Sequence, residues 1–103
     1  MERAGDVDRE RVVEGLIVLA AELADQGDPA AGLAVLDRAG LHPTRIESWH
    51  PRAWYAAADL AERMGDEDLA RDYLEAVVAV DPEMLDAAER LSMMDEGFNP
   101  PGG

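Results

Sequence analysis

The stretch "AWYAAADLAERMGDEDLARDYLEAVVAVDP" (residues 53–82) decides how this chain is expected to fold. Its apolar residues recur at steps of three and four, which is the spacing of one face of an α-helix. The pattern breaks at Gly65-Asp66, where glycine can end one helix in the left-handed conformation and aspartate can cap the next. Asp81-Pro82 ends the second helix and opens another. A turn this short makes the two helices antiparallel, so the stretch predicts a helical hairpin.

A second stretch of the same kind lies upstream. "LADQGDPAAGLAVLDRA" (residues 23–39) repeats the pattern, with its Gly-Asp pair 38 residues before the later one. This period falls in the range of helical-hairpin repeats. Helical spacing covers most of the chain and no segment alternates like a strand, so the fold is predicted to be all-α. The expected helices cover residues 8–26, 29–39, 51–64, 67–80 and 82–94.

The 103 residues are expected to form one domain. Residues 1–7 are assigned to an N-terminal lead, residues 8–94 to the helical domain and residues 95–103 to a flexible tail. The last helix should shield the second hairpin. Its inward residues are predicted to be Leu85, Ala88 and Leu91, and its outward residues Glu83, Asp86 and Glu89.

Residues 53–82 closely resemble a tetratricopeptide repeat. The matching positions are the tryptophan, the turn, the small residue at the helix crossing and the closing pair: Trp54, Gly65-Asp66, Ala70 and Asp81-Pro82. The departures from the family pattern are Ala57-Ala58, Ala61 and Val77. Residues 13–43 match more weakly, with Leu16 in place of the tryptophan and Gly32 in place of the crossing alanine. The resemblance implies two tetratricopeptide-like hairpins and a capping helix, and we expect Trp54 to be buried between the helices of its hairpin.

The charge of the chain limits the partners it can take. It carries 23 acidic and 9 basic residues, for a net charge of −14, and every basic residue is arginine. Such a charge repels nucleic acids and anionic membranes. The chain has no cysteine, its start does not read as a signal peptide, and its longest apolar run, residues 16–21, is too short to span a bilayer. A cytoplasmic protein is therefore expected.

Three groups of residues could suggest chemistry, and each has a simpler interpretation. The acids that follow Asp66 would need a glycine where Arg71 stands to form a calcium loop, so they are interpreted as a helix cap and first turn. His42 and His50 lack the further ligands of a zinc site and are expected to be partly exposed loop residues. Ser48 lies in a connector and not in a nucleophile turn. No metal, cofactor or catalytic site is predicted, and the chain is not expected to be an enzyme.

The resemblance implies that the first helices of the two hairpins line a concave, partner-binding groove. Tyr55 is the expected anchor, because aromatic residues and arginines dominate binding hot spots. The residues predicted to bind a partner are Glu14, Ile17, Val18 and Asp25 on the first helix, and Arg52, Tyr55, Asp59, Glu62 and Arg63 on the third.

The favoured function is a non-enzymatic protein-interaction module. Family members that clamp a carboxylate use lysines and asparagines in the groove, which this chain lacks there, so the expected partner is a basic or mixed apolar and basic protein or peptide. The alternative is an acidic regulator that occupies the nucleic-acid site of a basic protein. Either a hetero-complex or weak self-association is expected to cover the surface around Ile17, Val18 and Tyr55.

Overall fold

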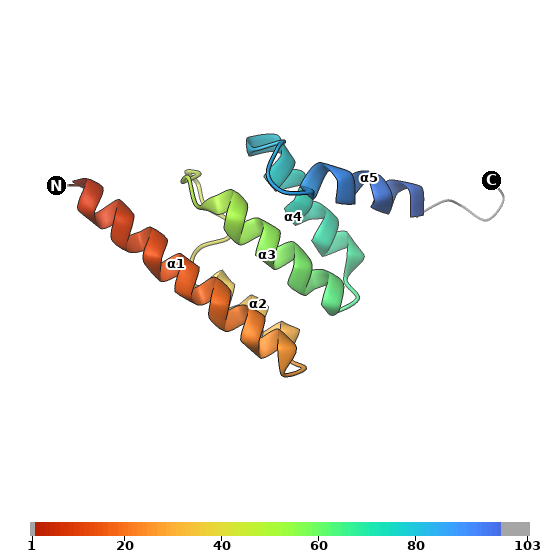
Figure 1. Cartoon of the computed structure of the whole chain (residues 1–103), viewed down its shortest axis with the longest axis horizontal. Helices are drawn as coiled ribbons and strands as arrows, with labels where there is room; N and C mark the ends of the chain where they lie inside the picture. Colours follow the sequence, from red (N-terminus) through yellow and green to blue (C-terminus); the bar gives the residue numbers. More distant parts are fainter. Residues whose placement is uncertain (1, 98–103) are drawn as a thin grey trace.

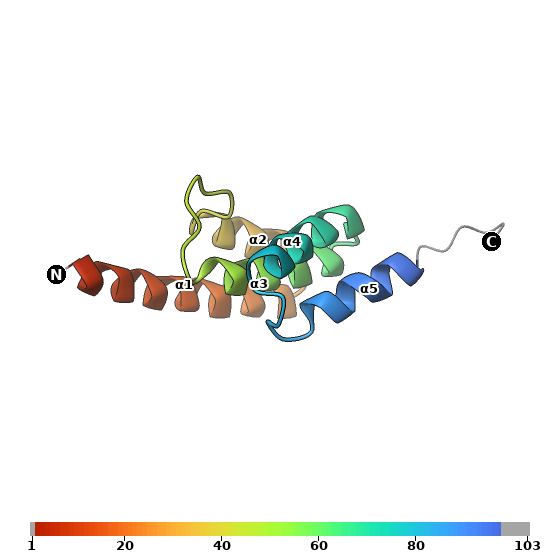
Figure 2. The same ribbon diagram turned by 90° about the horizontal axis from the view of Figure 1, so that it is seen from above.

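The computed structural model describes residues 2–97, with side chains from residue 9 to residue 94. Over these residues the chain is all-α, as predicted. The elements are α1 (Glu2–Asp25), α2 (Pro29–Asp37), α3 (His50–Arg63), α4 (Glu67–Val80) and α5 (Ala87–Gly97). Figure 1 shows two antiparallel hairpins, α1/α2 and α3/α4, followed by α5. Seen from above, α1, α3 and α5 form one layer, and α2 and α4 form the other (Figure 2).

Both hairpins turn through the same local structure. Gly27 and Gly65 have φ angles of 97° and 81°, in the left-handed region that glycine adopts without strain. The following aspartate caps the next helix: Asp28 accepts a hydrogen bond from the backbone of Ala31 at 3.1 Å, and Asp66 accepts one from Leu69 at 3.2 Å. The predicted turns are therefore confirmed, and the acids after Asp66 begin a helix.

The helices of the first hairpin come closer together than a side chain would allow. A Cβ atom added to Gly32 of α2 would lie 2.7 Å from the backbone oxygen of Ala20 in α1. Such a distance is a clash, so only glycine fits here. Ala70 of α4, at the matching position of the second hairpin, is fully buried.

The core runs between the two layers and is built largely from alanine and leucine. Trp54 is buried, as expected, and its indole N–H donates a 2.8 Å hydrogen bond to the carbonyl oxygen of Leu41 in the α2–α3 connector. The other large apolar or aromatic side chains that are buried are Val13, Leu36, Leu41, Leu60, Tyr73, Leu74 and Val77. Small alanines along α3 let the neighbouring helices approach it closely.

Two helix starts differ from the sequence prediction. Helix α1 begins at Glu2, so the residues assigned to a lead are helical from that point. Helix α5 begins at Ala87 and not at Pro82, because Leu85 has a φ angle of +49°, which interrupts a right-handed helix. Leu85 is consequently 68% exposed and Ala88 is also exposed, so their predicted inward placement is wrong. Ala87 is buried instead.

Leu91 packs against the core, as predicted. Helix α5 continues to Gly97, so the first residues assigned to the tail are helical, and residues 98–103 lie outside the described part of the chain. None of the helices within residues 2–97 is both long and apolar enough to cross a membrane.

A candidate partner-binding face

The outer stripes of α1 and α3 are joined by two ion pairs. Arg52 pairs with Glu14, and Arg63 lies 3.2 Å from Asp25. Arg63 also pairs with Asp59 on its own helix, at 3.2 Å. The hydrogen bond to Asp25 and the nearby charge of Asp59 raise the pKa of Arg63 above its ordinary value. Five of the predicted partner-binding residues are thus brought together on one face.

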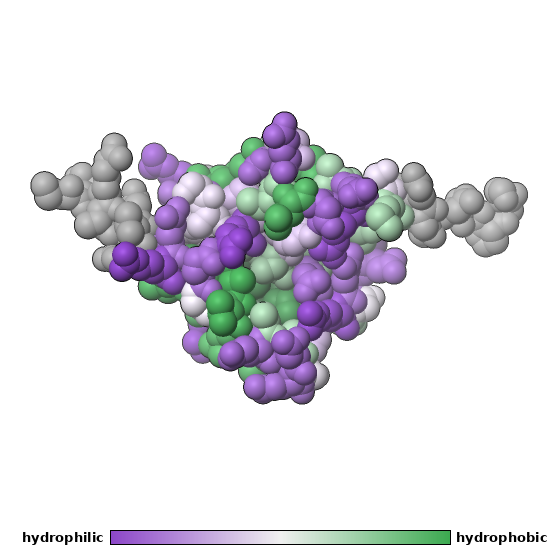
Figure 3. Space-filling model, viewed as in Figure 1, coloured by the Kyte–Doolittle hydropathy of each residue, from purple (hydrophilic) through white to green (hydrophobic). Residues whose placement is uncertain are grey.

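An apolar strip lies between these two ion pairs. On α1, Ile17 and Val18 fall between Glu14 and Asp25, and Val18 is 58% exposed. On α3, Ala56 falls between the two arginines and is only partly buried. Figure 3, which looks onto the layer of α1, α3 and α5, shows an apolar area bordered by hydrophilic side chains. The face therefore combines an apolar floor with charged ends.

The other edge of α3 faces α5. The hydroxyl of Tyr55 donates a hydrogen bond to the carboxylate of Asp86, and Arg90 pairs with Glu62. The guanidinium of Arg90 lies over the Tyr55 ring, 5.2 Å from its centroid, within the range of a cation–π contact. The hydrogen bond to Asp86, with a smaller contribution from burial, raises the pKa of Tyr55 above its ordinary value. Tyr55 is therefore held in place by Asp86, just before α5, and by Arg90 of α5, and it is not a free anchor.

Sequence reasoning missed Asp86 and Arg90. Asp86 was expected on the outer side of a helix, and Arg90 was given no role. The repeat pattern could have identified Asp86 and Arg90. A capping helix takes the place of the first helix of a further hairpin, so α5 should border the same face as α1 and α3.

Two hollows open at the ends of this face. One, of about 520 Å³, lies between α1, the connector and the start of α3, with Trp49 and Met84 in its wall. The other, of about 430 Å³, lies between the α3–α4 turn and α5, with Met93 and Met94 in its wall. Both are wide, open depressions that suit side chains of a macromolecular partner.

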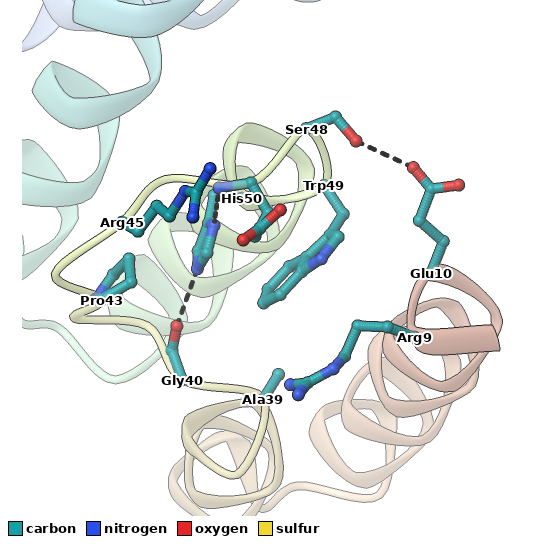
Figure 4. A pocket seen from close by; sticks show the side chains of 10 residues that line it. Arg9, Glu10, Ala39, Gly40, Pro43, Arg45, Ser48, Trp49 and His50 are labelled. Carbon is teal, nitrogen blue, oxygen red and sulfur yellow. Dashed lines mark hydrogen bonds between the residues drawn. The ribbon is translucent and has the colours of Figure 1, made fainter. Parts of the chain in front are cut away.

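The connector is held by His50. This residue was predicted to be a partly exposed loop histidine, but it is only 2% exposed, so that prediction is wrong. Its Nδ1 atom accepts a 2.7 Å hydrogen bond from the backbone N–H of Glu47, so its Nε2 carries the proton and donates to the carbonyl of Gly40 at 3.0 Å (Figure 4). Trp49 stacks on the ring, with centroids 3.9 Å apart. Both nitrogens are thus used by the backbone, and His50 is structural. His42 is exposed, as expected.

The described residues hold no group of three or more histidine, aspartate or glutamate side chains that could bind a metal ion. The hydroxyl of Ser48 in the connector donates a 2.9 Å hydrogen bond to the carboxylate of Glu10 in α1 (Figure 4). This contact ties the connector to α1.

Comparison with known proteins bears on the second hairpin. The tetratricopeptide repeat family model matches residues 51–94. These residues form a tetratricopeptide repeat. The match covers α3, α4 and most of α5, and it confirms the resemblance found in the sequence. The first hairpin lies outside the matched residues but shares the turn and cap of the tetratricopeptide repeat beside it. Neither the curated proteins nor the solved structures gave a significant match to the chain.

Proposed function

We propose that the chain is a non-enzymatic protein-interaction module that binds a peptide segment across the face formed by α1, α3 and α5. The observation that carries this proposal is the apolar strip of Ile17, Val18 and Ala56, framed by the two α1–α3 ion pairs. Tetratricopeptide repeats build interaction modules, which supports a protein partner. The predicted binding residues supply both edges of the strip.

The charges of the face favour a partner with basic side chains. Asp25 is the most open of the paired carboxylates, with 72% of its side chain exposed. Exposed ion pairs of this kind contribute only about 0–1 kcal/mol, so a partner's arginine or lysine can share or replace them at little cost. The net charge of −14 would also attract a basic partner at long range. A segment with aliphatic residues flanked by arginine or lysine fits both features.

The acidic-regulator alternative has less support on this face. Glu14, Asp25, Asp59 and Glu62 are already engaged by arginines of the same chain. A basic partner could exchange these pairs in either case, but a phosphate mimic would make no use of the apolar strip between them. The two functions also differ in their response to salt, because phosphate mimicry depends on charge alone, whereas the apolar strip would retain a ligand at high ionic strength.

Selection from a displayed library of random peptides tests the proposal. The wild-type protein should enrich peptides that combine aliphatic and basic residues. Ile17→Glu places a charge in the strip and should weaken binding of an enriched peptide at least about tenfold, as expected when an apolar contact is replaced by a buried charge. Tyr55→Ala should weaken it as well. The matched control is Val80→Glu, which alters an exposed valine of α4 outside the face.

Two results would contradict the proposal. One is enrichment of acidic peptides. The other is binding that is unaffected by both Ile17→Glu and Tyr55→Ala while the variants keep their helical circular dichroism. Binding that disappears entirely at high salt would favour the acidic-regulator alternative.

A further inference from the structure

Helix α1 carries an exposed apolar patch on a second side. The helix lies at one end of the molecule and packs against α2 and α3 (Figure 1). Three of its large aliphatic side chains are exposed: Val12 and Val18 at 58%, and Leu19 at 43%. Val12 lies three residues before Gly15, and Val18 and Leu19 lie three and four residues after it. The three side chains therefore surround Gly15 on the helix surface. We call Val12, Gly15, Val18 and Leu19 the Gly15 patch.

No contact among the described residues requires glycine at position 15. Gly15 is exposed, and a Cβ atom added to it would meet nothing within 4 Å. Glycine weakens the interior of a helix, and α1 is 24 residues long. Gly32 shows the contrast, because its missing side chain is required by the backbone of Ala20. Glycine flanked by exposed aliphatic residues lets a second helix approach the backbone closely at that point.

The charges beside the patch make it complementary to itself. Arg11 lies one turn before Gly15 and Glu22 lies one turn after Val18, on the same side of α1. Neither forms an ion pair with another described residue. When two copies of α1 are placed antiparallel about a two-fold axis, Val18 of each copy meets Gly15 of the other. The same operation sets Arg11 of each copy beside Glu22 of the other, so both pairs form twice.

We propose that a second copy of this chain docks on the Gly15 patch, through antiparallel packing of the two α1 helices. The valine of one copy fills the space above the glycine of the other, and the two arginine–glutamate pairs set the register. The site is distinct from the peptide-binding face, which it borders only at Val18. Two copies each carry a charge of −14, so their repulsion opposes association at low ionic strength. The dimer is therefore favoured by added salt, the opposite of the response expected for a basic partner.

Sedimentation equilibrium of the full chain tests the packing. At about 0.3 M salt, where charges more than about 6 Å apart are screened, the wild-type protein should dimerise below about 1 mM and dissociate at low salt. Gly15→Gln fills the gap and should weaken the dimer at least about tenfold. The melting temperature of the dilute variant should stay equal or rise, because the position is open within the monomer. The control is Ala88→Gln, which adds the same bulk at an exposed position of α5 and should have no effect.

Exchange of the two charges tests the register. Arg11→Glu and Glu22→Arg should each weaken self-association about tenfold, because each places like charges together twice. An equimolar mixture of the two variants should recover the wild-type affinity, since opposite charges then meet at both positions. A wild-type chain that stays monomeric at about 1 mM in both salt conditions would overturn the proposal. So would a dimer that is indifferent to Gly15→Gln, a mixture that fails to associate, or association only with another protein.

Discussion

The two hairpins of this molecule share a turn but differ in how their helices pack. Helices α1 and α2 contain 24 and 9 residues, whereas α3 and α4 contain 14 each. Each turn has a left-handed glycine and an aspartate cap, and in each the aspartate N–H donates a 2.9 Å hydrogen bond back to the preceding helix. Only the second hairpin is matched by the family model. The two hairpins thus share their turn chemistry and differ at the crossing of their helices, where Gly32 and Ala70 stand.

The two hairpins fill the space between their helices in different ways. The second hairpin buries two large aromatic side chains, Trp54 and Tyr73, with Ala70 at its crossing. The first buries no aromatic residue among the described side chains and brings its backbones together at Gly32. Large side chains can shift slightly to accept an added group, whereas two backbones in contact cannot. The first hairpin should therefore be the more sensitive to a single added methyl group, and the second to the loss of an aromatic ring.

Removal of the tryptophan side chain should have the largest effect. Trp54→Ala leaves a cavity and leaves the carbonyl of Leu41 without its indole donor. We expect a loss of about 3–5 kcal/mol in the free energy of unfolding, measured by urea denaturation. Trp54→Phe, which keeps a ring but loses the hydrogen bond, should cost less. A cost below about 1 kcal/mol for Trp54→Ala would show that the second hairpin does not depend on its aromatic core.

The same substitution at two glycines should have opposite effects. Gly32→Ala forces a Cβ atom against the backbone of Ala20 and should lower the free energy of unfolding by about 1–3 kcal/mol. Gly15→Ala, at an open position, should raise it by up to about 1 kcal/mol through helix propensity. Thermal melts of the two variants at low protein concentration make the comparison. Equal effects would mean that the close approach of α1 and α2 does not govern the first hairpin.

A substitution in the link between the second hairpin and α5 should give a smaller gain in stability. Leu85 adopts a left-handed conformation and is 68% exposed, so its side chain contributes little packing. Leu85→Asn should raise the free energy of unfolding by about 0.5–1 kcal/mol, because asparagine tolerates this conformation better. The neighbouring exposed Glu83, replaced by asparagine, is the control. A loss of stability in Leu85→Asn would indicate that the leucine side chain makes a packing contribution.

Ionisation of tyrosine should affect only the second hairpin, because both tyrosines of the chain belong to it. Burial, followed by the charges of Asp37 and Asp72, raises the pKa of Tyr73 above its ordinary value of about 10. Stability from this group is fully present below the unfolded pKa and is lost as the pH rises through the folded pKa. Denaturation between about pH 9 and 11 should thus show a decline that Tyr73→Phe reduces. An identical decline in that variant would assign it to other groups.

Much of this fold could be predicted, because helical spacing and the Gly-Asp turns are local signals. Glycine at positions 27 and 65 and aspartate at positions 28 and 66 acted as their chemistry requires. The errors occurred where a distant contact or a strained backbone decided the outcome. His50 is buried because its two ring nitrogens bond to the backbone of Gly40 and of Glu47, near the two ends of the connector. Helix α5 begins later than predicted because Leu85 has a positive φ angle.

The candidate face was predictable in part for the same reason. The stripes of α1 and α3 follow from the helical period, so Glu14, Asp25, Arg52 and Arg63 were placed on one face. That these acids and arginines would neutralise one another depends on how the two hairpins stack, and no local pattern carries that information. The contact of Tyr55 with Asp86 depends on α5 starting only at Ala87, which the sequence did not predict.

The contacts that α1 makes with α3 and with the connector just before it have a common spacing. The pairs Glu10–Ser48, Glu14–Arg52 and Asp25–Arg63 each join residues 38 positions apart, the same interval that separates the two Gly-Asp turns. Helix α3 thus lies beside α1 in the register of the 38-residue repeat, with no shift along the helix axis. The contacts that α3 makes with Asp86, just before α5, and with Arg90 of α5 span 31 and 28 positions. Helix α5 is thus displaced along α3 by about two or three helical turns from where a 38-residue interval would place it. The face therefore has a regular end and an offset end. If it binds a peptide as proposed, the peptide would meet different surroundings in its two directions, and we expect one polarity to be preferred.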